Sequence, residues 1–273
     1  MEDLDFTRPA KSEVYKPDIA RAFFESAGRP ESVAQGGIVF SENQQGGKMY
    51  YLLEGEIGLV RGQKNIDVVR AGEIIGEMAV VSRLPRTATA TARTPCRVIT
   101  LEAGQFKGAI QKMPEFALML LNIIINRLRL TIARLAMTRS LPEEEKWRES
   151  SVFNKDFLAR LQQELDREPA HHPLNKVIMK EGEAGIFMYI VCEGRVAISI
   201  KGKIVEKVGP GGVFGEMALV DQSPRAASAT AETDCYLLTV NRNDFLALVK
   251  SRPEFGVTLL KSVAERMRHL TAR

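Results

Sequence analysis

Cysteine, histidine and tryptophan are scarce in this sequence, with three, three and one in 273 residues. An odd number of cysteines argues against a disulfide framework. Cys96 and Cys235 lie in the apolar runs CRVITL and CYLLTV, where buried core thiols are expected. The opening residues, MEDLDFTRPAKSE, lack the basic and apolar segments of a signal peptide. These absences predict a cytoplasmic protein with reduced cysteines.

Long hydrophobic runs and an excess of one charge are also missing. The most apolar segment, Phe116 to Ile125, is interrupted by Asn122 and followed by Arg127 and Arg129. It is shorter than the roughly 20 apolar residues that a membrane span needs. The 38 Lys and Arg are nearly balanced by 34 Asp and Glu, which leaves a net charge of +4. We therefore predict no membrane span and no nucleic-acid partner.

The few histidines bear on catalysis and metal binding. His171, His172 and His269 do not form the two-His-plus-Glu pattern of a cupin metalloenzyme, the enzyme class that a small β-barrel would suggest. We interpret the adjacent His171 and His172 as a loop before Pro173 and as a poor chelate. No nucleophile with a matching base stands out. The sequence therefore predicts no enzyme, no catalytic residue, no metal and no cofactor.

What the sequence does contain is an internal repeat. Gly76-Glu77-Met78-Ala79 recurs as Gly215-Glu216-Met217-Ala218, and the same offset of 139 residues carries Pro85-Arg86 onto Pro224-Arg225. Other pairs under this offset are Gly46 and Gly185, Met49-Tyr50 and Met188-Tyr189, Glu54-Gly55 and Glu193-Gly194, and Pro114-Glu115-Phe116 and Pro253-Glu254-Phe255. A period this long indicates a duplicated domain. We place the first domain at 1–137, a linker at 138–151 and the second domain at 152–273.

Each copy is expected to be mainly β with flanking helices. In the first copy we predict helices at Asp18–Ala27 and from Pro114, a helix beginning at Glu102, and short strands at 37–40, 49–53, 56–60, 67–70 and 97–101. The second copy repeats this pattern, with helices at 154–167, from Asn241 and from Pro253, and a strand at 236–240. Many short strands separated by Gly turns predict two tandem β-roll or jelly-roll barrels, each flanked by N-terminal and C-terminal helices.

One recurring constellation suggests a bound anion. Residues 75–79 and 214–218 are expected to be strand-to-helix junctions, where free backbone amides favour a phosphate. Nine residues after each Glu, the planar guanidinium of Arg86 or Arg225 suits two oxygens of one phosphodiester. The small residues that follow, 87–89 and 226–228, leave room for a ligand near the backbone. A singly charged phosphate with a nearby sugar hydroxyl would match both the Arg and the Glu.

The segments GEIIGEMAVVSRLPRTATATA and GGVFGEMALVDQSPRAASATA resemble the phosphate-binding cassette of the cyclic nucleotide-binding domain family. This family includes catabolite activator proteins, kinase regulatory subunits and cyclic-nucleotide-gated channels, and the resemblance covers roughly residues 18–137 and 154–273. It implies that Glu77 and Glu216 bind the ribose 2′-hydroxyl and that Arg86 and Arg225 bind the cyclic phosphate. Nearby backbone amides would complete each cradle. The candidate ligand-binding residues are Gly76, Glu77, Met78, Ala79, Pro85, Arg86, Thr87 and Ala88, and Gly215, Glu216, Met217, Ala218, Pro224, Arg225, Ala226 and Ala227.

The residue after each Arg differs between the copies. In the family, alanine at this position is typical of cAMP sites and threonine of sites that also hold cGMP. Thr87 and Ala226 therefore imply cAMP or cGMP in the first site and cAMP in the second. The alternative is a degenerate pocket in which Glu and Arg form only a surface ion pair, worth about 0–1 kcal/mol.

The helix that begins at Pro114 carries two further hypotheses. Its a/d seam favours a homodimer through residues 114–137, although packing of the same residues onto their own barrel is the rival explanation. The seam residues are Leu118, Leu121, Ile125, Leu128, Ile132 and Leu135. The basic residues Arg127, Arg129, Arg134 and Arg139 indicate either a solvated face or a lid over the purine.

These features together predict a cytoplasmic cyclic-nucleotide sensor without its own effector domain. Ligand binding would rearrange a helix and signal to an unknown effector protein. One alternative is a kinase regulatory subunit, although residues 1–16 hold only Arg8, Lys11 and Lys16 rather than a clustered basic pseudosubstrate. Another is a transcription-regulator-like protein that lacks a DNA-binding domain, because no recognition helix follows the second copy. Bound zinc, iron or manganese would revive the cupin alternative.

Overall fold

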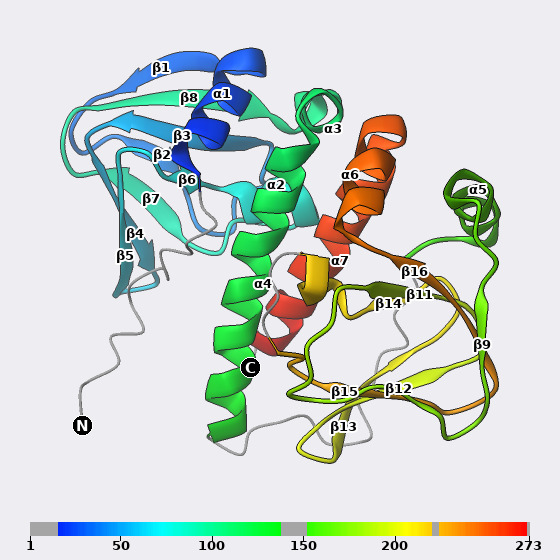
Figure 1. Cartoon of the computed structure of the whole chain (residues 1–273). Coiled ribbons are helices and arrows are strands. Elements are labelled where there is room, and N and C mark those ends of the chain that lie inside the picture. The colour runs from blue at the N-terminus through cyan, green and yellow to red at the C-terminus, as the bar shows by residue number, and fades with distance from the viewer. Residues whose placement is uncertain (1–15, 138–151, 220–223, 272–273) are drawn as a thin grey trace. The chain divides into compact units, whose positions relative to one another are not determined.

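The computed structural model describes residues 16–137, 152–219 and 224–271 (Figure 1). The side chains of Ala218 and of residues 126–137 and 266–271 lie outside this description, as does the linker predicted at 138–151. The helices are α1 (Pro17–Ala27), α2 (Glu77–Ser82), α3 (Ala103–Lys112), α4 (Pro114–Met137), α5 (Lys155–Leu165), α6 (Arg242–Ser251) and α7 (Pro253–Thr271), with the single-turn 3-10 helix η2 (Glu216–Leu219).

The first copy folds into two antiparallel sheets of four strands. One sheet has the order β1 (Arg29–Val33), β8 (Cys96–Glu102), β3 (Lys48–Glu54) and β6 (Ile74–Ile75). The other has the order β2 (Ile38–Phe40), β7 (Thr89–Ala92), β4 (Glu56–Arg61) and β5 (Lys64–Arg70).

The second copy repeats this topology. Its sheets have the orders β14 (Val213–Phe214), β11 (Met188–Glu193), β16 (Cys235–Val240) and β9 (Ala170–His172), and β10 (Val177–Met179), β15 (Ser228–Ala231), β12 (Val196–Ile200) and β13 (Lys203–Val208). Even the register is shared, because Tyr50 pairs with Ile75 and Tyr189 pairs with Phe214, which are the same positions under the offset of 139. The predicted class, mainly β with helices in two tandem copies, is confirmed.

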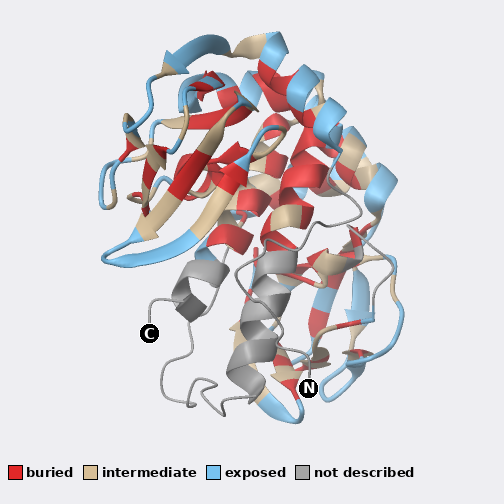
Figure 2. Cartoon of the chain, turned by 90° about the vertical axis from the view of Figure 1, so that its left-hand side faces the viewer, coloured by how far each residue is buried: buried red, intermediate tan, exposed pale blue. Residues whose placement is uncertain are grey.

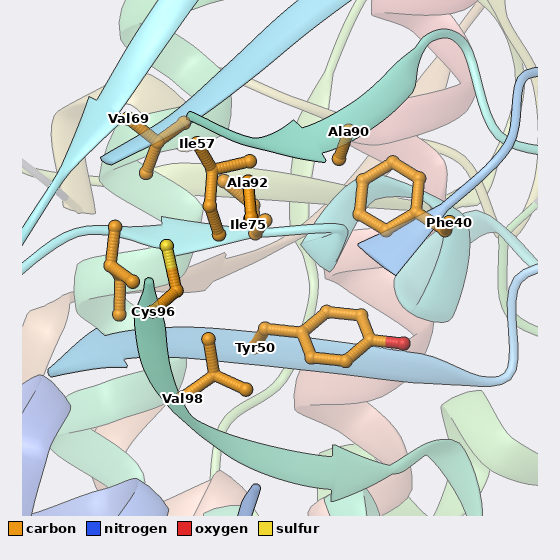
Figure 3. Close-up of a cluster of buried hydrophobic side chains, with 10 residues drawn as sticks. Phe40, Tyr50, Ile57, Val69, Ile75, Ala90, Ala92, Cys96 and Val98 are labelled. Carbon is orange, nitrogen blue, oxygen red and sulfur yellow. The ribbon is translucent and has the colours of Figure 1, made fainter. Parts of the chain in front are cut away.

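The core of the first copy lies between its two sheets. Buried side chains from strands of both sheets meet there, and Figure 3 shows Phe40, Tyr50, Ile57, Val69, Ile75, Ala90, Ala92, Cys96 and Val98. Buried positions alternate with partly buried ones along β7, as expected for a strand with one face toward a core. Figure 2 shows buried segments in both strands and helices of the chain. Cys96 and Cys235 are buried and unbridged in equivalent positions, which confirms the prediction of core thiols.

The helix ends follow local sequence signals. The helix predicted to begin at Glu102 is α3, and Glu102 forms a capping box with Gln105. Asn241 and Asp244 make the same reciprocal side-chain-to-backbone bonds at the start of α6. Asn154 caps α5 by accepting a hydrogen bond from the Phe157 amide at 2.9 Å.

The interior strands β7 and β15 were not predicted, and two edge strands also differ from the predictions. Residues His171 and His172, expected in a loop, belong to strand β9, which pairs with β16. Burial lowers the pKa of His172, and the nearby Lys176 and His171 lower it further. The strand β1, which includes Pro30, was not among the predicted strands. Both strands are at the edge of a sheet, where a residue without an N–H is tolerated and where short pairing leaves little sequence signal.

The compact units do not coincide with the sequence copies. The first unit comprises the described parts of Met1–Arg127 and Val249–Arg273, and the second comprises those of Leu128–Leu248. Helix α7 therefore packs within the first unit although its sequence belongs to the second copy. The boundaries at 137 and 152 stay a prediction about the sequence copies.

The first seam residues of α4 are buried within the chain itself. Leu118, Leu121 and Ile125 are buried, whereas the side chains of Leu128, Ile132 and Leu135 lie outside the described set. The homodimer stays a prediction. Within the described residues no single helix is long and apolar enough to cross a membrane, and α3 with residues 114–125 passes the same test only as a pair bent by 116°.

We predict that Asn154→Ala lowers the free energy of unfolding by about 1 kcal/mol, because the Phe157 amide loses its acceptor. Urea denaturation of the full chain measures the loss. Lys16→Ala is the matched control, because Lys16 is the N-cap of α1 and makes no side-chain capping bond. Equal effects of the two substitutions would contradict the prediction.

Candidate functional site

The first candidate site begins at a glycine with a left-handed backbone. Gly76 joins β6 to α2 with a φ of 79°, a conformation that L side chains rarely adopt. A Cβ at this position would also collide with Nη1 of Arg86. Glycine is therefore required at residue 76 both by the backbone conformation and by the arginine that lies against it.

The second candidate site has the same construction. Gly215 joins β14 to η2 with a φ of 72°, and a Cβ there would lie 2.9 Å from Nη1 of Arg225. The following turn is a 3-10 helix of four residues, Glu216–Leu219, rather than the six-residue α2. The predicted junctions of strand and short helix are thus present in both copies.

Arg86 is buried and bonded to the backbone. Only 5% of its surface is exposed. Its Nη1 donates to the carbonyl of Gly76 at 2.8 Å, and its Nη2 donates to the carbonyl of Lys48 at 2.5 Å. Its Nε is buried without a hydrogen-bond partner. The guanidinium also lies over the Phe40 ring, 4.2 Å from the ring centre.

Arg225 makes the equivalent bonds in the second copy. It is 7% exposed, and it donates to the carbonyls of Gly215 at 3.0 Å and Phe187 at 2.8 Å. These acceptors are the counterparts of Gly76 and Lys48 under the offset of 139. In both copies the arginine therefore bridges the glycine before the short helix and a residue at the start of a strand. That residue is Lys48, the first residue of β3, in the first copy and Phe187, just before β11, in the second.

The charge on each arginine is costly in this environment. Burial lowers the pKa of Arg86 and of Arg225, and the neighbouring Tyr50 with Glu77, or Tyr189 with Glu216, only partly opposes this effect. Within the described residues neither arginine forms an ion pair with a carboxylate. The hydrogen bonds of these buried cations to carbonyl groups leave their positive charge only partly compensated.

The backbone of each arginine is held by a loop that the sequence reasoning missed. Arg86 donates its amide to the carbonyl of Gln44 at 2.8 Å and accepts a hydrogen bond from the Asn43 amide at 3.0 Å. In the second copy the Arg225 amide donates to the Glu183 carbonyl, and the Gly182 amide donates to the Arg225 carbonyl. The repeated glycines Gly46 and Gly185 were the available signal, because each sits in this loop where a Cβ would collide with Ala79 or with Arg225.

The acidic residues and small neighbours of the cassette lie around these arginines. Glu77 and Glu216 are buried, at 3% and 4% exposure, which differs from the surface ion pair that was the alternative. Ala79 and Ala88 are buried, and Thr87 is exposed. The partly buried candidate residues are Met78, Pro85, Met217, Ala226 and Ala227. Pro224 is exposed, and the side chain of Ala218 lies outside the description.

The two sites differ beside the residue that follows the arginine. Arg61 donates from Nε to the carbonyl of Thr87 at 2.9 Å. Its counterpart is the buried Ile200, which cannot make this bond. The structure thus adds Arg61, Lys48 and Phe187 to the residues expected near the sites.

The described residues contain no group of three or more metal-ligating side chains that could hold an ion. His171 instead lies against Tyr236 and near Asp234, both on or beside β16.

A comparison with protein families decides what the repeated cassette is. The family model for the cyclic nucleotide-binding domain matches residues 30–113 and again residues 170–252, together more than half of the chain. The chain belongs to the cyclic nucleotide-binding domain family. The matched regions begin before β2 and β10 and end after α3 and α6, so each includes a complete cassette.

Curated relatives share parts of this chain. A cyclic nucleotide-gated potassium channel of Rhizobium etli is 40% identical over 94 residues, which are 34% of this chain and 26% of the channel. The cyclic AMP receptor protein of Thermus thermophilus is 35% identical over 102 residues, or 36% of this chain and 47% of the receptor. A cAMP-dependent protein kinase regulatory subunit of Eremothecium gossypii is 23% identical over 218 residues, or 80% of this chain and 43% of the subunit. The chain spans less than half the length of each.

Solved structures of the family align with it at low identity. The regulatory domain of Toxoplasma gondii PKA with cAMP is 21% identical, with a TM-score of 0.34 over 88% of this chain and 92% of that one. The Thermus thermophilus catabolite activator protein is 22% identical, with a TM-score of 0.42 over 48% of this chain and 63% of that one.

We predict that Gly76→Ala destabilises the ligand-free protein more than Gly72→Ala does. Both glycines have a positive φ, so both variants lose about 1–2 kcal/mol to backbone strain. Only the Cβ at residue 76 meets Arg86, whereas the space around a Cβ at residue 72 is open, so Gly76→Ala should lose about 1 kcal/mol more. Urea denaturation measures the difference, and equal losses would contradict the packing described for Arg86.

Proposed function

We propose that this protein is a cyclic-nucleotide sensor in which each copy binds one cyclic mononucleotide. The observation that carries the proposal is the buried arginine of each cassette, which is bonded to two carbonyls and to no carboxylate among the described residues. Family membership supports the same ligand class, because the matched domain is defined by cyclic nucleotide binding.

The chemistry of binding follows from these contacts. A cyclic phosphate carries one negative charge and two free oxygens, which suit the fork of a guanidinium. The unpartnered Nε of Arg86 supplies one donor, and the Nη groups exchange a carbonyl for a phosphate oxygen. The ion pair offsets the cost of burying the arginine. Glu77 and Glu216 would accept a hydrogen bond from the ribose hydroxyl.

The proposed role requires no bond to be made or broken in the nucleotide, and we assign no catalytic residue. Binding would pull the short helix after each glycine toward the ligand and change the helices packed on it, a population shift that a protein partner could read. We propose cAMP in the second site and cAMP or cGMP in the first. A kinase regulatory role is a second candidate, favoured by relatives that match both copies together, as the Eremothecium gossypii subunit does over 80% of this chain.

We predict that cAMP stabilises the protein against heat and that Arg86→Ala and Arg225→Ala each remove the contribution of one site. For each occupied site the expected gain is about 2.7 kcal/mol at a hundredfold excess over the dissociation constant. Thermal shift with cAMP, cGMP and a noncyclic nucleotide measures it. Arg83→Ala is the matched control, because it removes the same charge at an exposed position three residues before Arg86.

The double variant Arg86→Ala with Arg225→Ala should show no shift with any nucleotide while keeping the circular dichroism of the parent. A parent that responds to no cyclic nucleotide would overturn the proposed function. A response that persists in the double variant would instead overturn the role given to the arginines.

We predict that Thr87→Ala weakens cGMP binding at the first site about fivefold and leaves cAMP binding within about twofold, since one hydrogen bond contributes about 1 kcal/mol. The Thr87 side chain is exposed beside the cassette, so its hydroxyl is available to a guanine amino group. Titration calorimetry in the Arg225→Ala background isolates this site. The reciprocal Ala226→Thr, made with Arg86→Ala, should improve cGMP binding, and unchanged preferences in both variants would contradict the assignment.

A further inference from the structure

Helix α7 packs against helix α2 of the first cassette, although its sequence belongs to the second copy. The compact unit that contains β1 to β8 also includes Val249–Arg273. Within this unit α7 packs against α2, the helix that begins at the first site, and against α3. From the repeat alone we would expect α7 to pack on the second copy, because α7 is the counterpart of α4 and each barrel is expected to carry its own C-terminal helix.

The packing of α7 is extensive and sterically demanding. Its described residues Phe255, Leu259, Leu260, Val263 and Ala264 are fully buried. The helix approaches its neighbours closely at Gly256, where a Cβ would lie 2.8 Å from Cγ2 of Val249 and 3.6 Å from Cδ1 of Ile110 in α3. In α4 the equivalent residue is Ala117, so glycine replaces alanine in the helix that docks onto α3.

An ion pair joins the same two helices at their surface. Nζ of Lys107 in α3 lies 3.2 Å from Oε2 of Glu254 in the first turn of α7. Burial alone would raise the pKa of Glu254, but hydrogen bonds from its own backbone and from Lys107 outweigh this and hold the pKa below its usual value. The charged pair fixes the direction in which the start of α7 meets α3.

The contact with α2 connects α7 to the arginine. The carbonyl of Gly76, at the start of α2, accepts a hydrogen bond from Arg86, and Ala79, Val80 and Val81 of α2 are buried. Any shift of α2 therefore moves an acceptor of the buried guanidinium. A helix packed on α2 sets that position before the ligand arrives.

We infer that α7 is a positioning element of the first binding site, and that occupancy of this site is coupled to a helix encoded by the second copy. The inference rests on the proposed nucleotide binding. It assigns Gly256 and the Lys107–Glu254 pair as positioning residues that act through α2 and α3 and do not contact the ligand. By linkage, a ligand that moves α2 changes the docking of α7 by the same free energy with which α7 changes affinity.

The test substitutes Gly256 in the full-length chain and measures the two sites separately. Arg225→Ala leaves the first site active and Arg86→Ala leaves the second, and titration calorimetry with cAMP gives each dissociation constant. Gly256→Leu should weaken the first site at least about fivefold and leave the second within about twofold, a typical coupling. Glu265→Leu is the matched control, because it adds the same side chain at an exposed position of α7 and should change neither site.

A charge-reversal series keeps the inference falsifiable where Gly256→Leu fails to fold. Lys107→Glu and Glu254→Lys should each weaken the first site about twofold, and the double reversal should restore it, because an exposed pair contributes only a small free energy. A merely structural loss would not be rescued by the second reversal.

Hydrogen exchange in the absence of nucleotide gives a readout that does not depend on the proposed function. Gly256→Leu should reduce the protection of amides in α2 and α3 relative to the parent and to Glu265→Leu. The inference is overturned by a folded Gly256→Leu variant that keeps this protection, that changes only the second site, or that changes neither. A parent that binds no nucleotide overturns the proposed function instead, and the exchange data alone then decide the packing.

Discussion

The site depends on one interaction, a buried guanidinium that donates to two main-chain carbonyls. Arg86 joins the start of β3, at Lys48, to the start of α2, at Gly76, and Arg225 repeats the connection. Carbonyl dipoles neutralise a buried cation only in part, so the arrangement keeps an unmet demand for negative charge. It also constrains the backbone before each short helix. Gly76 and Gly215 have no room for a side chain beside the guanidinium, and both take a positive φ.

Duplication has kept this interaction and changed its surroundings. In the first copy the guanidinium lies over Phe40, and Arg61 holds the backbone of Thr87. In the second copy Met179 and Ile200 occupy those positions, and the arginine keeps only a more distant aromatic neighbour, Tyr189. The arginine and its two carbonyl acceptors are thus common to the two sites, while the groups next to the residue after the arginine differ. We expect any difference in affinity or in base preference between the copies to originate in these neighbours.

Sequence could predict the features that depend on local chemistry. The caps at Glu102, Asn154 and Asn241, the buried thiols and the cassette glycines all follow from residue type and spacing. The acceptors of the arginines could not be predicted, because a main-chain carbonyl has no side-chain signature. Strands β1 and β9 were missed since both are short edge strands, one with a proline and one with two histidines. The interior strands β7 and β15 were missed because TATA and SATA lack the large apolar residues that are typical of a strand. The docking of α7 was invisible for a different reason: equivalent sequences need not make equivalent tertiary contacts when their helices differ by residues such as Ala117 and Gly256.

The membership of Val249–Arg273 in the first unit has a consequence for how the chain reaches its native state. During synthesis the strands β1 to β8 leave the ribosome before the whole of the second unit, so α2 and α3 cannot contact α7 until that helix has been made. Closing that contact spans the intervening unit and carries the loop-closure entropy of a long segment. The first unit is therefore completed only by Val249–Arg273, which is synthesised after the whole of the second unit.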